Sequence, residues 1–274
     1  MNLIIRIAST EYNANDPIED RHDFRQLTSI KAFACAVYDG HGGWEASEYI
    51  KALLLSEIPK PGRVGSCALV TIIKNNKVYT ANVGDCKGVI VSQNDKKEWV
   101  ARKINHKLNA NSPKEQERLR KQFPNDKDIV VCKKKVEGAC YVKGMLMPTR
   151  AFGDFRLKYK EFYTKDDTFK GPYITHQPDI QIHEINKNDK YIIMASDGLW
   201  DEMKKVNIAK ITGDNYKDKI SIVQELFNYA FRNAAKNAKL TEKELGLVEP
   251  GKRRNLHDDI TIICIDLTNQ YASS

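Results

Sequence analysis

The chain has 274 residues, of which 41% are hydrophobic and 29% charged, and its formal net charge at pH 7 is +8. These proportions are ordinary for a globular protein and exclude a disordered or collagen-like chain. No apolar run approaches the roughly 20 residues that span a bilayer, and residues 1–10 lack the apolar stretch of a signal peptide. We therefore expect an intracellular protein without a membrane partner, in the cytoplasm, with the nucleus and the mitochondrion left open.

In chain order, short β-branched segments between turn residues predict strands, and segments with caps or an apolar stripe predict helices. The predicted elements are a strand at 32–38, a helix at 44–55, strands at 77–83 and 87–91, a helix after Ser112-Pro113, a strand at 191–195, a helix at 217–239, a capping box at Thr241 and Glu244, and a strand at 260–266.

Two details of this pattern carry further expectations. Gly84-Asp85 has the residue types and spacing of a hairpin turn between two of the strands. The helix at 217–239 places one apolar face on Ile220, Val223, Phe227, Ala230 and Phe231. Because no linker or repeat divides the chain, we expect one α+β domain over residues 1–274.

The cysteines and the basic charge both favour unremarkable interpretations. Six cysteines occur without a C-x-x-C pair, so we expect buried thiols rather than disulfides or zinc ligands: Cys35, Cys67, Cys86, Cys132, Cys140 and Cys264. The positive charge is scattered over the chain, and no stripe of interleaved basic and aromatic residues suggests a nucleic-acid groove. We therefore expect no nucleic-acid partner, and a metal-dependent nucleic-acid hydrolase is disfavoured.

Acidic residues at strand ends are the most informative feature. Asp39 follows the strand at 32–38, Asp197 follows the strand at 191–195, Asp258-Asp259 precede the last strand, and Glu19-Asp20 lie near the start of the chain. Carboxylates gathered beside a core repel one another unless a cation neutralises them, and oxygen ligands suit Mg²⁺ or Mn²⁺ better than zinc. Any one of these acids taken alone is better explained as a turn former or a helix cap, and only the set taken together favours a metal site.

Six motifs in a fixed order make the sequence recognisable. They are PIEDRHDF (17–24), FACAVYDGHGG (33–43), TANVGDCKGVI (80–90), PTRAFGDFRLK (148–158), IIMASDGLWDEM (192–203) and HDDITIICI (257–265). With them the chain resembles the metal-dependent serine/threonine protein phosphatases of type 2C. It is most similar to the pyruvate dehydrogenase phosphatase branch, through NDPIEDR, HKLNANSPKEQERLRKQFP, GPYITHQPDI and the DDIT sequence.

The resemblance implies a four-layer αββα fold, with a central sandwich of mostly antiparallel sheets flanked by helices, and a site for two Mg²⁺ or Mn²⁺ ions. Asp39 would bridge the two ions. Asp197 and Asp258 would complete the protein ligands of one ion, and Glu19 with the Gly40 carbonyl would complete those of the other. Asp20 would hold a metal-bound water. His41 would protonate the leaving oxygen, although a loop histidine packed on Trp44 is the alternative.

The implied reaction is hydrolysis of phosphoserine and phosphothreonine in proteins, by a metal-bridging hydroxide that attacks phosphorus in line. The expected partners are phosphorylated proteins, and we expect a monomer. The alternative is a catalytically silent binding module that kept the fold and lost its metals. The presence of Glu19, Asp20, Asp39, Asp197 and Asp258 argues against it.

Three departures from the common family pattern remain. Asn15 stands where many relatives have an arginine that grips the phosphate, and Arg21 and Arg25 are replacements unless they are simply solvated. Asn105 replaces an aspartate of an optional third metal site, which we expect to be weak or empty. Asp201 would be its surviving ligand, or merely a first-turn helix acid. The segment between Gly43 and Gly65 is also shorter than is usual.

Overall fold

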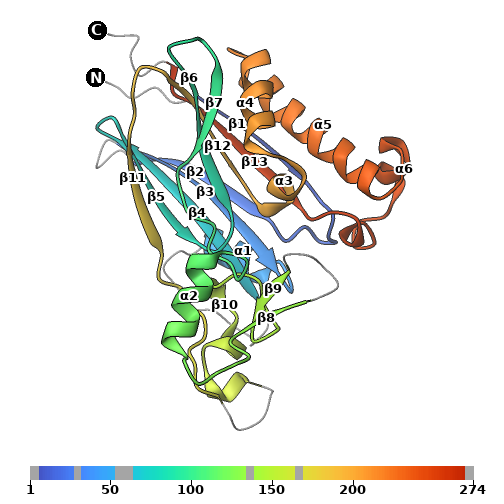
Figure 1. Ribbon diagram of the computed structural model, residues 1–274. Coiled ribbons are helices and arrows are strands. Elements are labelled where there is room, and N and C mark those ends of the chain that lie inside the picture. Colours follow the sequence, from blue (N-terminus) through green and yellow to red (C-terminus); the bar gives the residue numbers. More distant parts are fainter. Residues whose placement is uncertain (1–5, 28–31, 53–63, 134–138, 164–168, 269–274) are drawn as a thin grey trace.

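Two antiparallel sheets stack face to face at the centre of the computed structural model, which describes residues 6–27, 32–52, 64–133, 139–163 and 169–268 (Figure 1). The first sheet has the strand order β1 (Arg6–Tyr12), β13 (Ile260–Asp266), β12 (Asp189–Ala195), β6 (Lys87–Gln93) and β7 (Trp99–Lys103). The second has the order β11 (Asp179–Glu184), β5 (Lys77–Val83), β4 (Gly65–Lys74), β3 (Ala32–His41) and β2 (Arg21–Leu27), with the short β10 (Phe152–Gly153) paired to β4.

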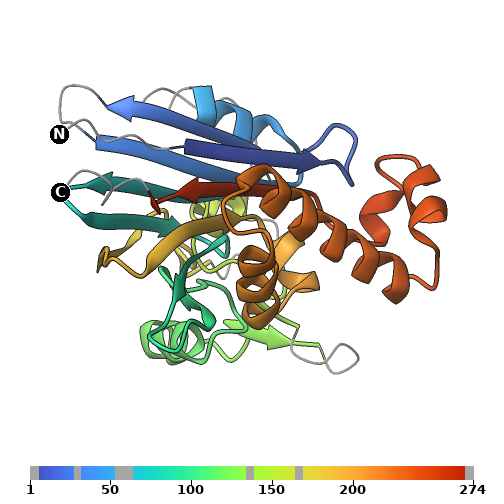
Figure 2. The same cartoon turned by 90° about the horizontal axis from the view of Figure 1, so that it is seen from above.

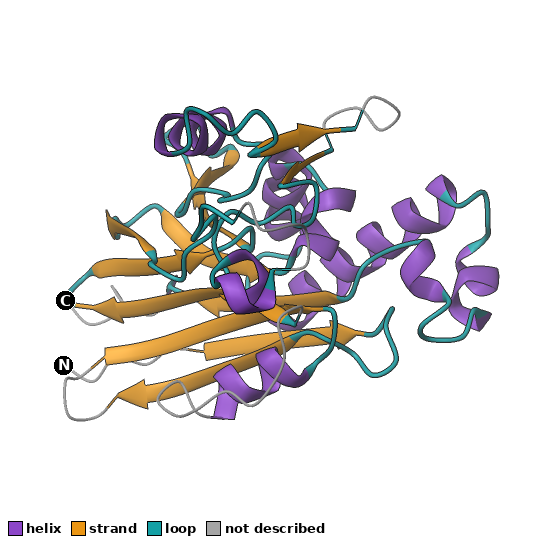
Figure 3. Ribbon diagram, turned by 90° about the horizontal axis from the view of Figure 1, so that it is seen from below, coloured by secondary structure: helices purple, strands orange, loops and turns teal. Residues whose placement is uncertain are grey.

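Helices cover both outer faces of this sandwich (Figures 2 and 3). Helix α1 (Glu45–Ala52) packs on β2, β3 and β4 of the second sheet. The first sheet is covered by α3 (Asp197–Glu202), α4 (Lys205–Asp214) and α5 (Lys219–Asn237), and α6 (Glu242–Leu247) packs on α5. This is the αββα layering expected from the sequence. Among the described residues, no helix combines the length and the apolar character needed to cross a membrane.

Burial on both faces explains why the central strands are almost continuously apolar. In β3, Phe33, Cys35 and Val37 enter the core between the sheets, whereas Ala36 and Tyr38 pack toward α1. The side chains of β13 alternate in the same way. Ile263 and Ile265 lie between the sheets, and the others pack against α5, namely Ile260, Ile262 and Cys264. The five predicted strands are confirmed.

The predicted helices are confirmed with one error. The helix predicted at 44–55 begins at Glu45 and is described to Ala52, and residues 53–55 lie outside the described part, as does most of the shortened segment before Gly65. Thr241 and Glu244 form the predicted capping box. Ile220, expected on the apolar face of α5, is 68% exposed, because the buried face is centred on Ile222, Val223, Leu226, Ala230 and Phe231.

A smaller apolar cluster lies beside the sandwich. It is formed by residues of α2 (Pro113–Gln122), the pair of strands β8 (Val130–Cys132) and β9 (Cys140–Val142), and the short 3₁₀ helix η2 (Phe155–Leu157). A second 3₁₀ helix, η3 (Lys160–Phe162), follows η2. Cys132 and Cys140 face each other across β8 and β9 and form a disulfide. The expectation of free thiols is therefore wrong for this pair, whereas Cys35, Cys67, Cys86 and Cys264 are buried and free.

The predicted hairpin at Gly84-Asp85 is also wrong, and the error matters for the site. Strands β5 and β6 lie in different sheets, so the chain at Gly84–Cys86 crosses from one sheet to the other. Gly84 has φ 108°, and a Cβ there would collide with the Cys67 side chain, so the crossing requires glycine. As a result Asp85 is buried where the two sheets meet.

Candidate metal centre

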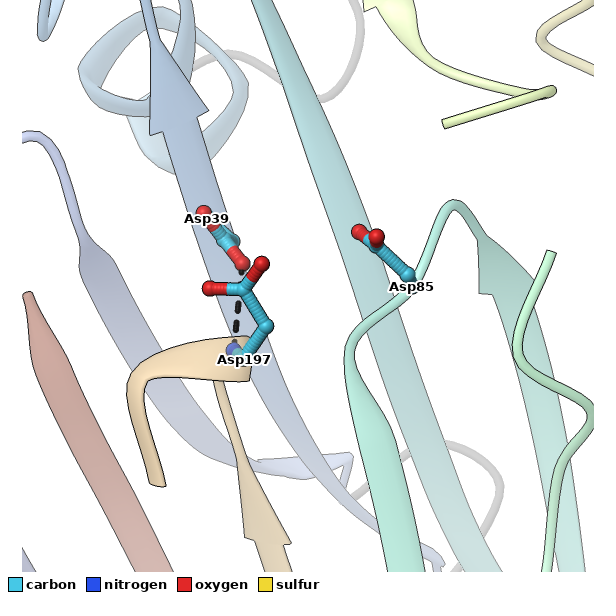
Figure 4. Close-up of side chains that lie close together, drawn as sticks. All are labelled: Asp39, Asp85 and Asp197. Carbon is cyan, nitrogen blue, oxygen red and sulfur yellow. Dashed lines mark hydrogen bonds between the residues drawn. The ribbon is translucent and has the colours of Figure 1, made fainter. Parts of the chain in front are cut away.

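Three aspartates from separate parts of the fold converge at one end of the sandwich. Asp39 comes from the end of β3, Asp85 from the crossing between β5 and β6, and Asp197 from the first residue of α3, directly after β12. One carboxylate oxygen from each lies within 4.8 Å of those of the other two. Figure 4 shows the carboxylates of Asp39 and Asp197 close together, with Asp85 facing them from the neighbouring segment. The cluster therefore forms only when both sheets are assembled.

The hydrogen-bond donors to these carboxylates are weak and neutral. Asp39 Oδ2 accepts from the Asp197 backbone N–H at 3.4 Å and from the Cys86 thiol at 3.8 Å. Asp85 accepts from the Cys67 thiol at 3.3 Å and from Asn109 Nδ2 at 3.1 Å. Within the described ranges, none of the three aspartates forms a salt bridge with a lysine, an arginine or a histidine. The charge of Lys107 acts on Asp197 and Asp85 from a longer distance, so three carboxylates are balanced by no directly paired cation.

The protonation behaviour of the cluster follows from this environment. Burial raises the pKa of Asp39 well above its usual range, and the charges of Asp197, Asp20, Asp258 and Asp85 raise it further. Burial likewise raises the pKa of Asp197, followed by the charges of Asp258 and Asp85. Acids that disfavour one another's ionisation in this way are stabilised as carboxylates by a nearby cation.

The donor set fits a divalent hard cation. Asp197 Oδ1 and Asp20 Oδ2 are buried and have no hydrogen-bond partner among the residues that the structure describes, and a buried oxygen without a partner is costly unless it binds an ion or water. The donors are carboxylate oxygens, which Mg²⁺ and Mn²⁺ prefer. The nearest thiols, Cys67 and Cys86, have pKa values raised by burial and by these same aspartates, which disfavours the thiolate form that zinc requires.

The structure places the other predicted ligands around this cluster. Asp20 and Asp258 lie close enough for their charges to act on Asp39, and Asp258 acts on Glu19, whose pKa is raised mainly by burial. Gly40 packs backbone to backbone against Glu19, and a Cβ at position 40 would collide with the Glu19 carbonyl. The ends of β3 and of the 19–20 loop therefore meet as the resemblance implied.

Asp201 and Asn105, the residues expected at the third metal site, do not join the central cluster of aspartates. The Asp201 side chain is 64% exposed and lies 3.6 Å from Lys107 Nζ. Asn105 is buried and turned toward backbone, because its Oδ1 accepts from Gly88 N–H and its Nδ2 donates to the Cys86 carbonyl. Its amide is thus occupied in holding β6 rather than presented to an ion.

Asp85 and Asp259 are site residues that the sequence interpretation missed. Asp85 was assigned to a hairpin, although it lies in the TANVGD motif. Asp259 Oδ1 accepts the backbone N–H groups of Ala14 at 2.5 Å and Asn15 at 2.8 Å, and Oδ2 accepts Asn15 Nδ2 at 2.9 Å and Glu19 N–H at 2.7 Å. This single carboxylate fixes the loop that carries Glu19 and Asp20 against the start of β13.

His41 is positioned by a buried acid rather than by an aromatic ring. Its Nε2 lies 2.8 Å from Asp154 Oδ2, and no ring contact with Trp44 occurs in the described part of the chain. Burial alone would lower the pKa of His41, but the charge of Asp154 and its hydrogen bond raise the pKa above the ordinary value. His41 Nδ1 has no hydrogen bond within the described residues, so a protonated ring can donate from that nitrogen.

The arginines proposed as phosphate ligands are engaged elsewhere. Arg21 Nε donates to Glu48 at 2.5 Å, and its Nη1 donates to the carbonyls of Ile18 and Asp20. Arg25 pairs with Asp23 on the surface. A different cation, Arg254, lies 2.6 Å from Asp258 Oδ2. The pKa of Asp258 is nevertheless raised to about 6, because burial outweighs the opposing charge of Arg254.

Comparisons with known proteins agree on one family. The model of the family described as protein phosphatase 2C matches residues 52–238. "Probable protein phosphatase 2C 78" of Oryza sativa subsp. japonica is 30% identical over 311 aligned residues, which cover 95% of this chain and 78% of the relative. "Probable protein phosphatase 2C 46" of Arabidopsis thaliana is 31% identical over 284 residues, with 86% and 74% covered.

Solved structures show the same fold. The crystal structure of serine-threonine phosphatase 2C from Toxoplasma gondii superposes with a TM-score of 0.67 at 16% identity, covering 96% of this chain and 94% of that one. The structure of a C. elegans sex determining protein superposes with a TM-score of 0.65, also at 16% identity, covering 96% and 65%. At this level of identity the superpositions establish the architecture.

Proposed function

The chain belongs to the protein phosphatase 2C family and is a metal-dependent serine/threonine protein phosphatase, and we propose that it works with two Mg²⁺ or Mn²⁺ ions at the cluster of Asp39, Asp85 and Asp197. The observation that carries this proposal is the convergence of these three carboxylates from both sheets, two of them buried and one partly buried, without a directly paired cation in the described residues. Its substrates are phosphorylated proteins, as the family implies.

The proposed ligand roles follow the resemblance. Asp39 would contribute to both ions, Asp197 and Asp258 to one, and Glu19 with the Gly40 carbonyl to the other, while the place of Asp85 beside Asp39 supports adding it to the set. When bound, such ions neutralise phosphoryl oxygens and lower the pKa of water. The weak third site would have Asp201 as its ligand, and its exposure supports low affinity.

The chain's own residues would manage the protons of the reaction. Asp20 has a buried, unpartnered Oδ2, with which it can accept a hydrogen bond from the attacking water. His41 would donate a proton from Nδ1 to the departing serine or threonine oxygen, a poor leaving group that benefits from an acid. Asp154 would keep the ring oriented and protonated through Nε2.

A finer placement near the pyruvate dehydrogenase phosphatase branch is also proposed. Asn15 of the NDPIEDR sequence and Asp259 of the DDIT sequence both support this placement. The two residues are in contact, because Asn15 Nδ2 donates a hydrogen bond to Asp259 Oδ2. Asn15, which stands in place of the common arginine, and Asp259 are therefore direct partners. The placement concerns sequence relationships and does not name the substrate.

We further propose a monomeric, intracellular enzyme formed by one domain over residues 1–274. The single core shared by both sheets supports one domain, and the cover of helices on both faces supports a monomer. Four buried free thiols support a reducing compartment, the cytoplasm in particular. The Cys132–Cys140 disulfide, in contrast, is typical of an oxidising compartment.

The test is hydrolysis of a phosphothreonine peptide and of p-nitrophenyl phosphate with Mn²⁺ and with EDTA. The wild type and Asp214→Asn, a change at an exposed residue of α4, should turn over both substrates with Mn²⁺ and neither with EDTA. Asp39→Asn should lose most turnover. Binding of the phosphopeptide without any metal-dependent turnover in the wild type would instead support the silent binding module.

A further inference from the structure

Two adjacent arginines before β13 have opposite environments. Arg253 is 5% exposed, and its guanidinium donates to the carbonyls of Asn13, Gly246 and Val248 and lies 4.8 Å from the ring centre of Tyr12. Arg254 has a 44% exposed side chain, and its one protein partner within the described residues is Asp258. Arg253 thus anchors the short helix η4 (Arg253–Asn255), which presents Arg254 at the rim of the acid cluster.

The charges that act on Arg254 locate it beside the proposed reaction site. Burial opposes its ionisation, but Asp258, Asp197, Glu19 and Asp259 all raise its pKa. Three of these residues, Asp258, Asp197 and Glu19, are proposed metal ligands. The guanidinium of Arg254 therefore lies at the edge of the proposed metal site, in contact with one of its ligands.

The other polar groups near the site are already engaged. Asn15 is neutral, and its side-chain amide is held by Asp259. Arg21 and Arg25 are paired with Glu48 and Asp23. Lys107 pairs with Asp201 at 3.6 Å and is also acted on by the charges of Asp85 and Asp197.

The free donors of Arg254 suit a phosphate group. Only Nη1 is engaged, by Asp258 Oδ2 at 2.6 Å, and Nε and Nη2 have no partner within the described part of the chain. A planar guanidinium can present two parallel N–H groups to two phosphoryl oxygens, which a lysine ammonium cannot do. Anchoring by Arg253 limits the entropy that would be lost on binding.

We propose that Arg254 binds the phosphate group of the phosphoserine or phosphothreonine substrate, in place of the arginine that Asn15 does not supply. The inference rests on the proposed function and adds a substrate-binding residue to it. The competing role is purely positional: Arg254 would then orient Asp258 as a metal ligand and would never touch the phosphate.

The experiment compares the wild type with Arg254→Ala, Arg254→Lys, Lys107→Gln and Lys252→Ala. Lys252 is the matched control, because it lies two residues away, is largely exposed and pairs only with Glu249. Isothermal titration calorimetry gives the dissociation constant of Mn²⁺, and then that of inorganic phosphate at saturating Mn²⁺. Kinetics on a phosphothreonine peptide give KM and kcat separately.

Arg254→Ala should weaken phosphate binding and raise KM by about tenfold or more, the loss expected for a charge-assisted pair, with Mn²⁺ affinity changed by less than about threefold. Arg254→Lys should recover part of the phosphate affinity, and it tests the inference if the alanine variant does not fold. Lys252→Ala should behave as the wild type.

Three results would overturn the inference: unchanged phosphate affinity in both Arg254 variants, a loss confined to Mn²⁺ affinity, or a loss of phosphate affinity in Lys107→Gln but not in Arg254→Ala. Failure of the wild type to turn over substrate with Mn²⁺ would refute the proposed function. The phosphate titration would still decide separately whether Arg254 binds the anion.

Discussion

His41 Nε2 and Asp154 Oδ2 lie 2.8 Å apart although 113 positions separate the two residues in the sequence. The contact joins the DGHGG motif at the end of β3 to the RAFGD motif, where Asp154 is fully buried with φ 50°. The buried carboxylate of Asp154 forms an ion pair with the protonated His41 ring, so this acid controls the protonation of His41.

Asp154→Asn should therefore move the basic limb of the pH–rate profile to lower pH. A general acid must be protonated, and loss of the carboxylate lowers the raised pKa of His41, so activity falls off at a lower pH than in the wild type. The profile should be measured on a phosphothreonine peptide. An unshifted basic limb in a variant with normal thermal stability would show that His41 is not the acid.

The leaving group separates acid catalysis from other roles of His41. His41→Gln should reduce kcat on a phosphothreonine peptide by about 10²-fold or more, the usual contribution of a positioned acid. It should reduce kcat on p-nitrophenyl phosphate far less, because nitrophenolate leaves without a proton. Equal losses on both substrates would contradict the assignment and would favour a structural role at the cleft.

Asp85→Asn tests the ligand that the sequence interpretation overlooked. Loss of one carboxylate from the cluster should weaken Mn²⁺ binding by about 10- to 100-fold, as measured by titration calorimetry. Asp95→Asn is the control, since Asp95 is exposed in the turn between β6 and β7. Wild-type Mn²⁺ affinity in Asp85→Asn would leave Asp85 outside the metal site.

Asp259→Asn should lower the free energy of unfolding by about 1–3 kcal/mol, because the buried carboxylate accepts four hydrogen bonds and an amide presents donors to some of them. Asn15→Ala should cost less, since it removes only one of the four. Urea unfolding in EDTA measures both losses without the contribution of metal. A larger loss in Asn15→Ala would contradict this ordering.

The acid cluster makes stability depend on pH in a predictable direction. Burial raises the pKa of Asp258 to about 6 in the folded protein, above its ordinary value of 3.8 in the unfolded chain. The unfolded state therefore releases this proton first, and Asp258 reduces stability as pH rises from about 4 to 6. The raised pKa values of Asp39 and Asp197 likewise lower the stability of the metal-free protein as pH rises. A cation that binds the carboxylates reverses the effect, so Mn²⁺ should raise Tm more at pH 7.5 than at pH 5. An equal or smaller shift at pH 7.5 would contradict this.

The strands could be predicted because each carries a local signal. Phe33 to Val37 and Ile262 to Ile265 are apolar on both faces and are bounded by turn residues, so their identity as buried strands does not depend on distant parts of the chain. The αββα layering came from the resemblance, since no local pattern states how two sheets stack.

The errors share one physical cause, which is that the decisive information is non-local. Gly84-Asp85 has the chemistry of a hairpin turn, but only the assignment of β5 and β6 to different sheets makes it a crossing and buries Asp85. The pairing of Cys132 with Cys140 depends on the register of β8 and β9. Likewise, no local pattern distinguishes the adjacent Asp258 and Asp259, and only the resemblance assigned Asp258 to the metal site. In the structure Asp258 contacts Arg254, whereas Asp259 holds residues 14–19.

The most direct test of the account is anomalous diffraction from crystals soaked in Mn²⁺. Two peaks are expected beside Asp39, one toward Asp197 and Asp258 and the other toward Glu19 and the Gly40 carbonyl. Crystals that show no anomalous peak within ligand distance of Asp39, or peaks only at other acidic residues, would contradict the claim that folding assembles these carboxylates around a pair of catalytic ions.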